Sequence, residues 1–130
     1  RSLRDWSSDV CSSDLASDPL IKTIITDTDS DTTVETAAGG DADLYFVEIT
    51  NPNTVAVYTK LFAAASGSSP TDQHFLQFYC PASTNCYAYI PTFLLIGGGI
   101  QFYTTTDPGA VGSQCNPTEK VIVKIGLTVN

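Results

Sequence analysis

The stretch Leu44-Tyr-Phe-Val-Glu-Ile-Thr-Asn-Pro-Asn-Thr-Val-Ala-Val-Tyr-Thr-Lys-Leu-Phe62 decides the fold class of this chain. Its first part is a run of β-branched and aromatic residues, which favour a pleated and half-buried strand. Asn51-Pro52-Asn53 then interrupts the run with residues that are typical of turns. The pattern predicts two strands that are joined in a hairpin.

Alternation of apolar and polar residues continues after this turn and indicates further strands. Val55, Val57 and Leu61 fall on one face of the second strand, and Tyr58 and Lys60 fall on the other. Other strands are predicted where alternation is bounded by Gly, Pro, Asn or Asp, namely at residues 20–26, 32–37, 75–80, 86–90, 100–105 and 121–129. The last of them is predicted to face the interior with Val121, Val123, Ile125, Leu127 and Val129.

The strands are short and no convincing helix interrupts them. The sequence therefore predicts an all-β fold, an antiparallel two-sheet β-sandwich that is Greek-key or jelly-roll-like, with about 7–8 strands and no significant helix. Residues 75–80 and 86–90 are predicted to form a second hairpin. Gly97-Gly98-Gly99 lacks the Lys and the following helix of a phosphate-binding loop. It is predicted to mark a strand junction where the backbone bends or approaches another segment closely.

The front of the chain is interpreted as an artefact. Residues 4–15 resemble the in-frame translation of a sequencing-adapter oligonucleotide, and the chain contains no Met. We therefore expect residues 1–15 to be disordered and residues 16–130 to form a single domain whose native N-terminus is missing. Trp6 and Cys11 then carry no functional argument.

The chain is acidic, with a formal net charge of -8. Without residues 1–15, four lysines face eleven carboxylates. Such a surface offers no electrostatic footprint for nucleic acid, and it is poorly suited to anionic membrane surfaces. No apolar run reaches the ~18–20 residues of a membrane-spanning helix. We expect neither nucleic acid nor a membrane as a partner.

Three cysteines remain outside the adapter-like segment. Cys80 and Cys86 flank a short turn, and we predict a disulfide between them across the second hairpin, worth about 2 kcal/mol or less. Two buried free thiols are the alternative. Cys115 lies in a long polar loop, and its partner stays open between Cys80, Cys86, another subunit and a cysteine of the missing N-terminal segment. The spacings match no zinc pattern.

Groupings that could carry catalysis are hard to find. His74 is the only histidine, and it lies near Asp72, Ser68 and Ser69. A nucleophile, base and carboxylate can be chosen from these residues, but no nucleophile-elbow sequence accompanies them. The favoured interpretation is a solvent-exposed loop histidine. We therefore predict no catalytic residue, no cofactor and a protein that is not an enzyme.

The run Asp27-Thr28-Asp29-Ser30-Asp31 is the one candidate for a metal site. Alternating carboxylates can project oxygen atoms toward Ca²⁺ from one side of a loop. The run lacks the glycine and the flanking helices of an EF-hand. An acidic, solvated turn between two edge strands is the favoured interpretation, and Asp27, Asp29 and Asp31 remain a weak calcium candidate.

Four tyrosines form the second candidate site, because they are predicted to line one sheet face: Tyr79, Tyr87, Tyr89 and Tyr103. Exposed tyrosines anchor protein interfaces and also stack on sugars. An outer sheet face or a subunit interface is favoured over a glycan site, because the domain contains no Trp that would complete a sugar platform.

The order of these segments resembles that of small β-sandwich virion structural proteins encoded by environmental tailed phages. The resemblance covers residues 30–129. It rests on the paired segment at 44–62, a small-residue loop, a central hairpin, a strand ending in Thr104-Thr105-Thr106, a Gly/Pro/Ser loop and a Val-rich final strand. The chain departs from that pattern in its three cysteines and in the hydrophobic residues 93–96.

The resemblance implies a non-enzymatic bacteriophage virion protein, such as a capsid decoration, tail or fibre-associated module. Its expected location is the virion, and its expected partners are copies of itself and other virion proteins. The alternative is a carbohydrate-binding or adhesive β-sandwich module of a secreted or cell-surface protein, with a host-surface glycan as its ligand.

Overall fold

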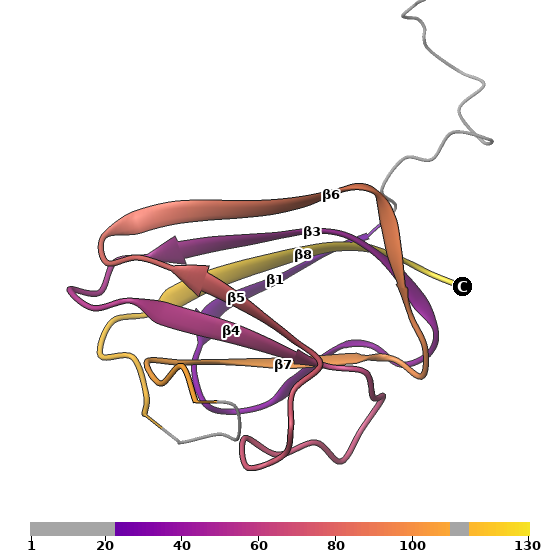
Figure 1. Cartoon of the computed structure of the whole chain (residues 1–130), viewed down its shortest axis with the longest axis horizontal. Helices are drawn as coiled ribbons and strands as arrows, with labels where there is room; N and C mark the ends of the chain where they lie inside the picture. The colour runs from indigo at the N-terminus through magenta and orange to yellow at the C-terminus, as the bar shows by residue number, and fades with distance from the viewer. Residues whose placement is uncertain (1–22, 110–114) are drawn as a thin grey trace, which may run out of the picture.

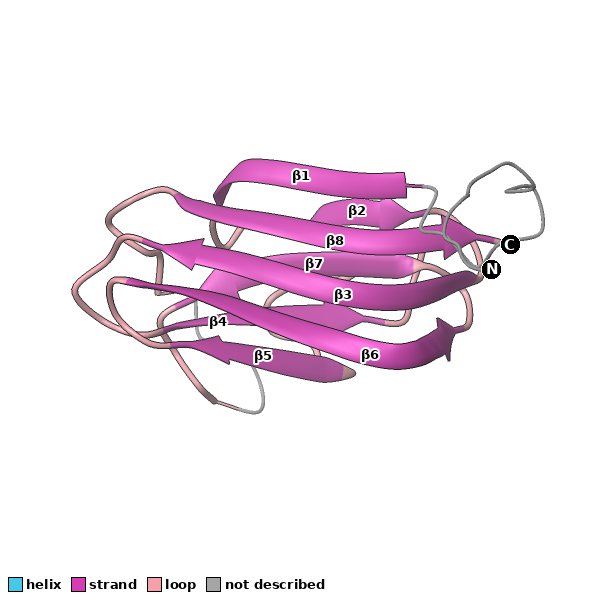
Figure 2. Ribbon diagram, turned by 90° about the horizontal axis from the view of Figure 1, so that it is seen from above, coloured by secondary structure: helices cyan, strands magenta, loops and turns pink. Residues whose placement is uncertain are grey.

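Two antiparallel sheets packed face to face make up the domain (Figures 1 and 2). The computed structural model describes residues 23–109 and 115–130, so the predicted artefact at residues 1–15 lies outside the described residues. In the described residues there are eight strands and no helix, which confirms the predicted all-β sandwich. The strands are β1 (Thr23–Ser30), β2 (Glu35–Ala38), β3 (Ala42–Asn51), β4 (Val57–Phe62), β5 (Leu76–Cys80), β6 (Thr84–Ile96), β7 (Ile100–Thr105) and β8 (Val121–Val129).

The strand order is that of a jelly roll. One sheet, here sheet A, has the order β1-β8-β3-β6, and the other, sheet B, has the order β2-β7-β4-β5. Strand β1 pairs with β8, β2 with β7, β3 with β6 and β4 with β5, as if one long hairpin had been folded over itself. The tip of that folded hairpin is the connection between β4 and β5.

Both predicted hairpins are wrong. Strands β3 and β4 lie in different sheets, and so do β5 and β6, so each short connection carries the chain across the sandwich (Figure 1). Alternation tells which residues of a strand face the interior, but it does not tell which strand is the neighbour.

Side chains of two asparagines hold the crossing between β3 and β4. Asn51 donates from Nδ2 to the carbonyl oxygens of Val55 (3.0 Å) and Pro81 (2.9 Å). Its Oδ1 accepts hydrogen bonds from the backbone nitrogen (3.0 Å) and the side-chain amide (2.9 Å) of Asn53. Asn53 in turn accepts from the backbone nitrogen of Glu119 at 2.7 Å. The connections β3–β4, β5–β6 and β7–β8 therefore meet in one network of hydrogen bonds around two buried asparagines.

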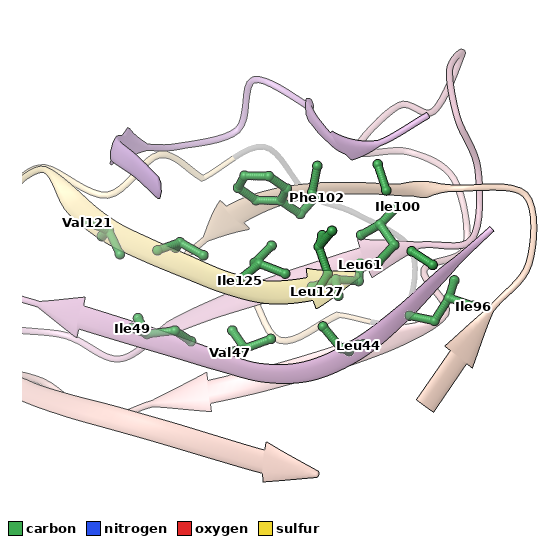
Figure 3. Packing of buried hydrophobic residues seen from close by; sticks show 14 of the residues in the cluster. Leu44, Val47, Ile49, Leu61, Ile96, Ile100, Phe102, Val121, Ile125 and Leu127 are labelled. Carbon is green, nitrogen blue, oxygen red and sulfur yellow. The ribbon is translucent and has the colours of Figure 1, made fainter. Parts of the chain in front are cut away.

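The core fills the space between the sheets, and Figure 3 shows side chains of both sheets meeting there. The inward residues of β8 are fully buried as predicted, except that Val129 at its end is exposed. Val55 was predicted to share a face with Val57 and Leu61, but it lies in the crossing before β4 and is exposed. The labelled core residues of Figure 3 are Leu44, Val47, Ile49, Leu61, Ile96, Ile100, Phe102, Val121, Ile125 and Leu127.

Strand β6 is longer than predicted, because it continues through Pro91 to Ile96. Proline lacks the N–H that a central strand needs, and it is tolerated here because β6 is an edge strand of sheet A. The pairing of β3 with β6 shifts its register between Leu44 and Phe46, opposite this proline. Regular pairing is confined to the two parts of β6 on either side.

Candidate interaction surface

The four candidate tyrosines do not share one sheet face. Tyr87 and Tyr89 lie on β6 and are exposed on the outside of sheet A, whereas Tyr79 is exposed on β5 of sheet B. Tyr103 is fully buried on β7, and its hydroxyl donates to the carbonyl oxygen of Pro70 at 3.3 Å. The prediction was wrong because the jelly roll distributes β5, β6 and β7 over both sheets.

The two open edges of the sandwich differ in charge. At one edge, β1 carries Asp27 and Asp29, and β2 carries Glu35. At the other edge, which we call the β5/β6 edge after its two strands, neither strand contains a charged residue. Residues 73–106 include no Asp, Glu, Lys or Arg at all. A chain with a net charge of -8 therefore presents one neutral edge.

Aromatic rings project from the β5/β6 edge. Tyr87 and Tyr89 are 56% and 67% exposed, and their rings are nearly parallel, at 6° with centroids 5.8 Å apart. The ring of Tyr89 also contacts that of Phe46 on the neighbouring strand β3, with centroids 5.9 Å apart. The Phe46 ring lies over Gly126 of β8. A side chain at position 126 would clash with this ring, so the glycine leaves room for it. The rings thus form an apolar row that crosses sheet A.

The sandwich is incompletely closed between β5 and β6. Phe78, Cys86 and Ile90 pack against the core, yet all three are only partly buried. A cavity of about 200 Å³ lies between the two strands. Its lining residues come from β3, β5 and β6: Val47, Ile49, Gln77, Phe78, Tyr79, Cys86, Tyr87 and Ala88.

Cys80 and Cys86 are free thiols in this structure, so the predicted disulfide is not formed in it. They also do not oppose each other in a hairpin, since Cys80 ends β5 in sheet B and Cys86 lies on β6 in sheet A. The Cys80 Sγ instead lies 3.3 Å from the carbonyl oxygen of Thr84. Cys115 is exposed between β7 and β8, and its carbonyl oxygen accepts a hydrogen bond from the Thr105 hydroxyl.

Connecting segments cover part of the outer face of sheet B, at Lys60 and Tyr103. Lys60 is 0% exposed, and its Nζ donates to the carbonyl oxygen of Gly109 at 2.7 Å. The ammonium lies 5.8 Å from the ring centroid of Tyr103. Burial lowers the pKa of Lys60, and the nearby charge of Asp107 opposes that shift. Lys60 was predicted on the strand face opposite Val57 and Leu61, but its burial under the segment that contains Gly109 was not predicted.

His74 is half-buried, so the prediction of a solvent-exposed histidine was wrong. It borders a depression of about 420 Å³ that Asp72 and Ser68 also line. Burial lowers the pKa of His74, and the positive charge of Lys60 lowers it further. Its Nδ1 has no hydrogen-bond partner, and the Asp72 carboxylate accepts instead from the Ser69 backbone nitrogen at 2.8 Å. His74 thus lacks the carboxylate on Nδ1 that orients the base of a catalytic triad.

The acidic run was predicted to be a turn, but Asp27 and Asp29 lie within β1 and only Asp31 follows the strand. The Asp27 carboxylate accepts from the backbone nitrogen of Asp29 at 3.1 Å, and that of Asp31 accepts from Thr33 at 2.8 Å. The pKa of Asp27 is raised, chiefly by burial. Across residues 23–109 and 115–130, no three His, Cys, Asp or Glu side chains are grouped to hold a metal ion. The weak calcium candidate at Asp27, Asp29 and Asp31 remains a prediction.

Comparison of the chain with protein-family models, with curated proteins and with solved structures finds no match. The part of the chain that the structure describes contains no helix suited to spanning a membrane.

Sequence reasoning missed part of this surface, including Phe46, Phe93 and Leu95. Phe93 and Leu95 are exposed on β6, and the Phe93 ring contacts Tyr45 with centroids 6.1 Å apart. The absence of charge from residues 73–106 is the sequence signal that could have identified the β5/β6 edge.

Proposed function

We propose that this chain is a non-enzymatic structural module of a virus particle, and that it assembles with copies of itself through the β5/β6 edge. The observation that carries the proposal is an uncharged edge with exposed aromatic residues and an incompletely closed core beside it. The jelly-roll order of the strands supports the virion part of the proposal, because capsid domains use this architecture.

Unprotected edge strands pair readily with other strands. Proteins usually protect them with charged residues, prolines or bulges, because their outer N–H and C=O groups are free to pair. Strand β6 has 13 residues and no charge, and its protective features, Pro91 and the register shift beside it, are confined to residues 90–93. The part of β6 before Pro91 pairs on one side with β3 over residues 84–89 and is an edge on the other. That part is suited to accept one more antiparallel strand.

A second copy of this chain is the partner that the charge distribution favours. Two copies that each carry a net charge of -8 repel one another over most of their surfaces. The repulsion is smallest where charges are absent, and the β5/β6 edge is such a place. Antiparallel pairing of β6 with β6 of another copy is symmetric and closed, as in most homodimers. It would join two four-stranded sheets into one continuous sheet.

Changing Tyr89 to Lys is expected to weaken self-association by about 10–100-fold, because a charge then lies on each side of the paired edge and an aromatic anchor is lost. The dissociation constant is measured by sedimentation equilibrium of the full chain over a range of concentrations. Ile24→Lys is the matched control, because Ile24 is 57% exposed on β1 at the opposite edge of the same sheet. A parent protein that is monomeric throughout, or equal effects of the two variants, would contradict the proposed interface.

The virion assignment has its own test. Genes that flank the coding sequence on the source DNA are expected to encode capsid, portal or tail proteins. Genes for polysaccharide utilisation in those positions would contradict the assignment, even if the protein self-associates.

Glycan binding is the second candidate function, and one observation favours it. Tyr87 and Tyr89 present two nearly parallel exposed rings, and aromatic rings stack on the apolar faces of sugars. Lectin domains also use the jelly roll. Binding on a glycan array that disappears when both tyrosines are changed to Ala would support this function, whereas an array without signal would remove it.

A further inference from the structure

Cys80 lies close to the strand pair that carries Cys86, on the other side of the gap between the sheets. Cys80 is fully buried at the end of β5, and its Sγ lies 3.3 Å from the carbonyl oxygen of Thr84 and 3.8 Å from that of Ile49. Ile49 is the residue of β3 that pairs directly with Cys86 on β6. The Cys80 Sγ therefore lies against the part of sheet A that carries the Cys86 thiol, and the two thiols are neighbours. A bond between them would join the last residue of β5 in sheet B to β6 in sheet A.

Only one of the two thiols can be reached from solvent. Cys86 is partly exposed and lines the cavity of about 200 Å³ between β5 and β6, whereas Cys80 is fully buried and does not line it. Burial raises the pKa of Cys80 to about 12, and the neighbouring Cys86 thiol adds to that shift. Since the thiolate is the reactive form of cysteine, Cys86 is the residue that a reagent in the cavity meets first.

We propose that Cys80 and Cys86 form a redox-active dithiol, which low-molecular-weight disulfides oxidise reversibly to a disulfide that closes the β5/β6 edge. The proposal does not rest on the proposed function, because it concerns only the two thiols and the cavity beside them.

The reaction is a pair of thiol–disulfide exchanges. The Cys86 thiolate attacks one sulfur of the small disulfide, so that a mixed disulfide forms at Cys86 and one thiolate leaves. Cys80 then loses its proton and attacks the sulfur of Cys86, which releases the second small thiolate. Each protein thiol gives up one proton and one electron, and the reagent is reduced to two thiols. The second step is the slow one, because buried Cys80 is difficult to deprotonate.

The test uses the full chain with Cys11→Ser and Cys115→Ser, so that only the two thiols of interest remain. After incubation with oxidised glutathione, the intact mass is expected to fall by two hydrogen atoms, with no glutathione retained. Both cysteines should then resist alkylation after unfolding, and dithiothreitol should restore them. The thermal midpoint is expected to rise by about 5–10 °C, because the bond removes conformational freedom from the unfolded chain.

Two variants distinguish a closing dithiol from a merely accessible cysteine. Cys80→Ala keeps the accessible thiol and is expected to hold one glutathione as a stable adduct, whereas Cys86→Ser is expected not to react. A parent protein that retains glutathione at Cys86, or that does not react at all, would overturn the proposal. The mass of the parent protein decides this even if Cys80→Ala does not fold.

Discussion

Changing Gly99 to Ala is expected to destabilise the domain by about 3–5 kcal/mol, which is a large part of the stability of a typical domain. Gly99 has a φ of +129°, a conformation that residues with a side chain rarely adopt. A Cβ atom there would lie 2.7 Å from the carbonyl oxygen of Ala38 and 2.9 Å from the backbone nitrogen of Ala65. Since both neighbours are backbone atoms, neither can rotate away. The midpoint of urea-induced unfolding measures the loss.

Gly97→Ala is the matched control in the same Gly97-Gly98-Gly99 turn. At Gly97 a Cβ atom would meet nothing nearer than the Asp41 carboxylate at 3.9 Å, and the backbone has no positive φ there. Its substitution is expected to change stability by less than about 1 kcal/mol. Equal losses in the two variants would mean that flexibility of the whole turn, rather than the close approach at Gly99, is what the fold requires.

The sequence indicates the strands and the glycine turn, because both depend on local chemistry. Period-two alternation reports which residues of β8 face the core, and the glycine run reports a close backbone approach that Gly99 then makes. Pairing between strands depends instead on contacts between distant residues. Asn51 was interpreted as a turn residue, yet its amide also reaches the carbonyl oxygens of Cys80 and Pro81. These hydrogen bonds tie the end of β3 in sheet A to the end of β5 in sheet B, beside the crossing to β4.

Only part of the candidate surface could be predicted from the sequence, as was also true of the fold. Tyr87 and Tyr89 are exposed on one face, as alternation along β6 implies. Tyr103 belongs to an equally regular strand, but the connection that contains Pro70 covers it. Lys60 is buried for the same kind of reason, since the loop after β7 lies over it. Loops carry no periodic signal, so the sequence does not tell which part of a sheet they will cover.

Changing Asn51 to Ala is expected to destabilise the domain by about 3–4 kcal/mol, because several buried backbone groups then lose their partner. The carbonyl oxygens of Val55, Cys80 and Pro81 and the backbone nitrogen of Asn53 all bond to the Asn51 side chain. Leaving a buried polar group unpaired costs about 1–3 kcal/mol, and water entering the end of the sandwich offsets part of the sum. The difference in unfolding free energy is measured by urea-induced unfolding. The slope of that free energy against urea concentration is expected to be the same in both proteins.

Exposed Asn85 on β6 supplies the control, and Asn85→Ala is expected to change stability by no more than about 0.5 kcal/mol. Asn53→Ala tests whether the two asparagines act as one unit. Asn51 and Asn53 bond directly to each other, so the double variant should lose less stability than the single variants together. Fully additive losses would indicate two independent turns. An unchanged midpoint in Asn51→Ala would mean that backbone pairing alone directs β4 across the sandwich, and that the jelly-roll crossing does not depend on this amide.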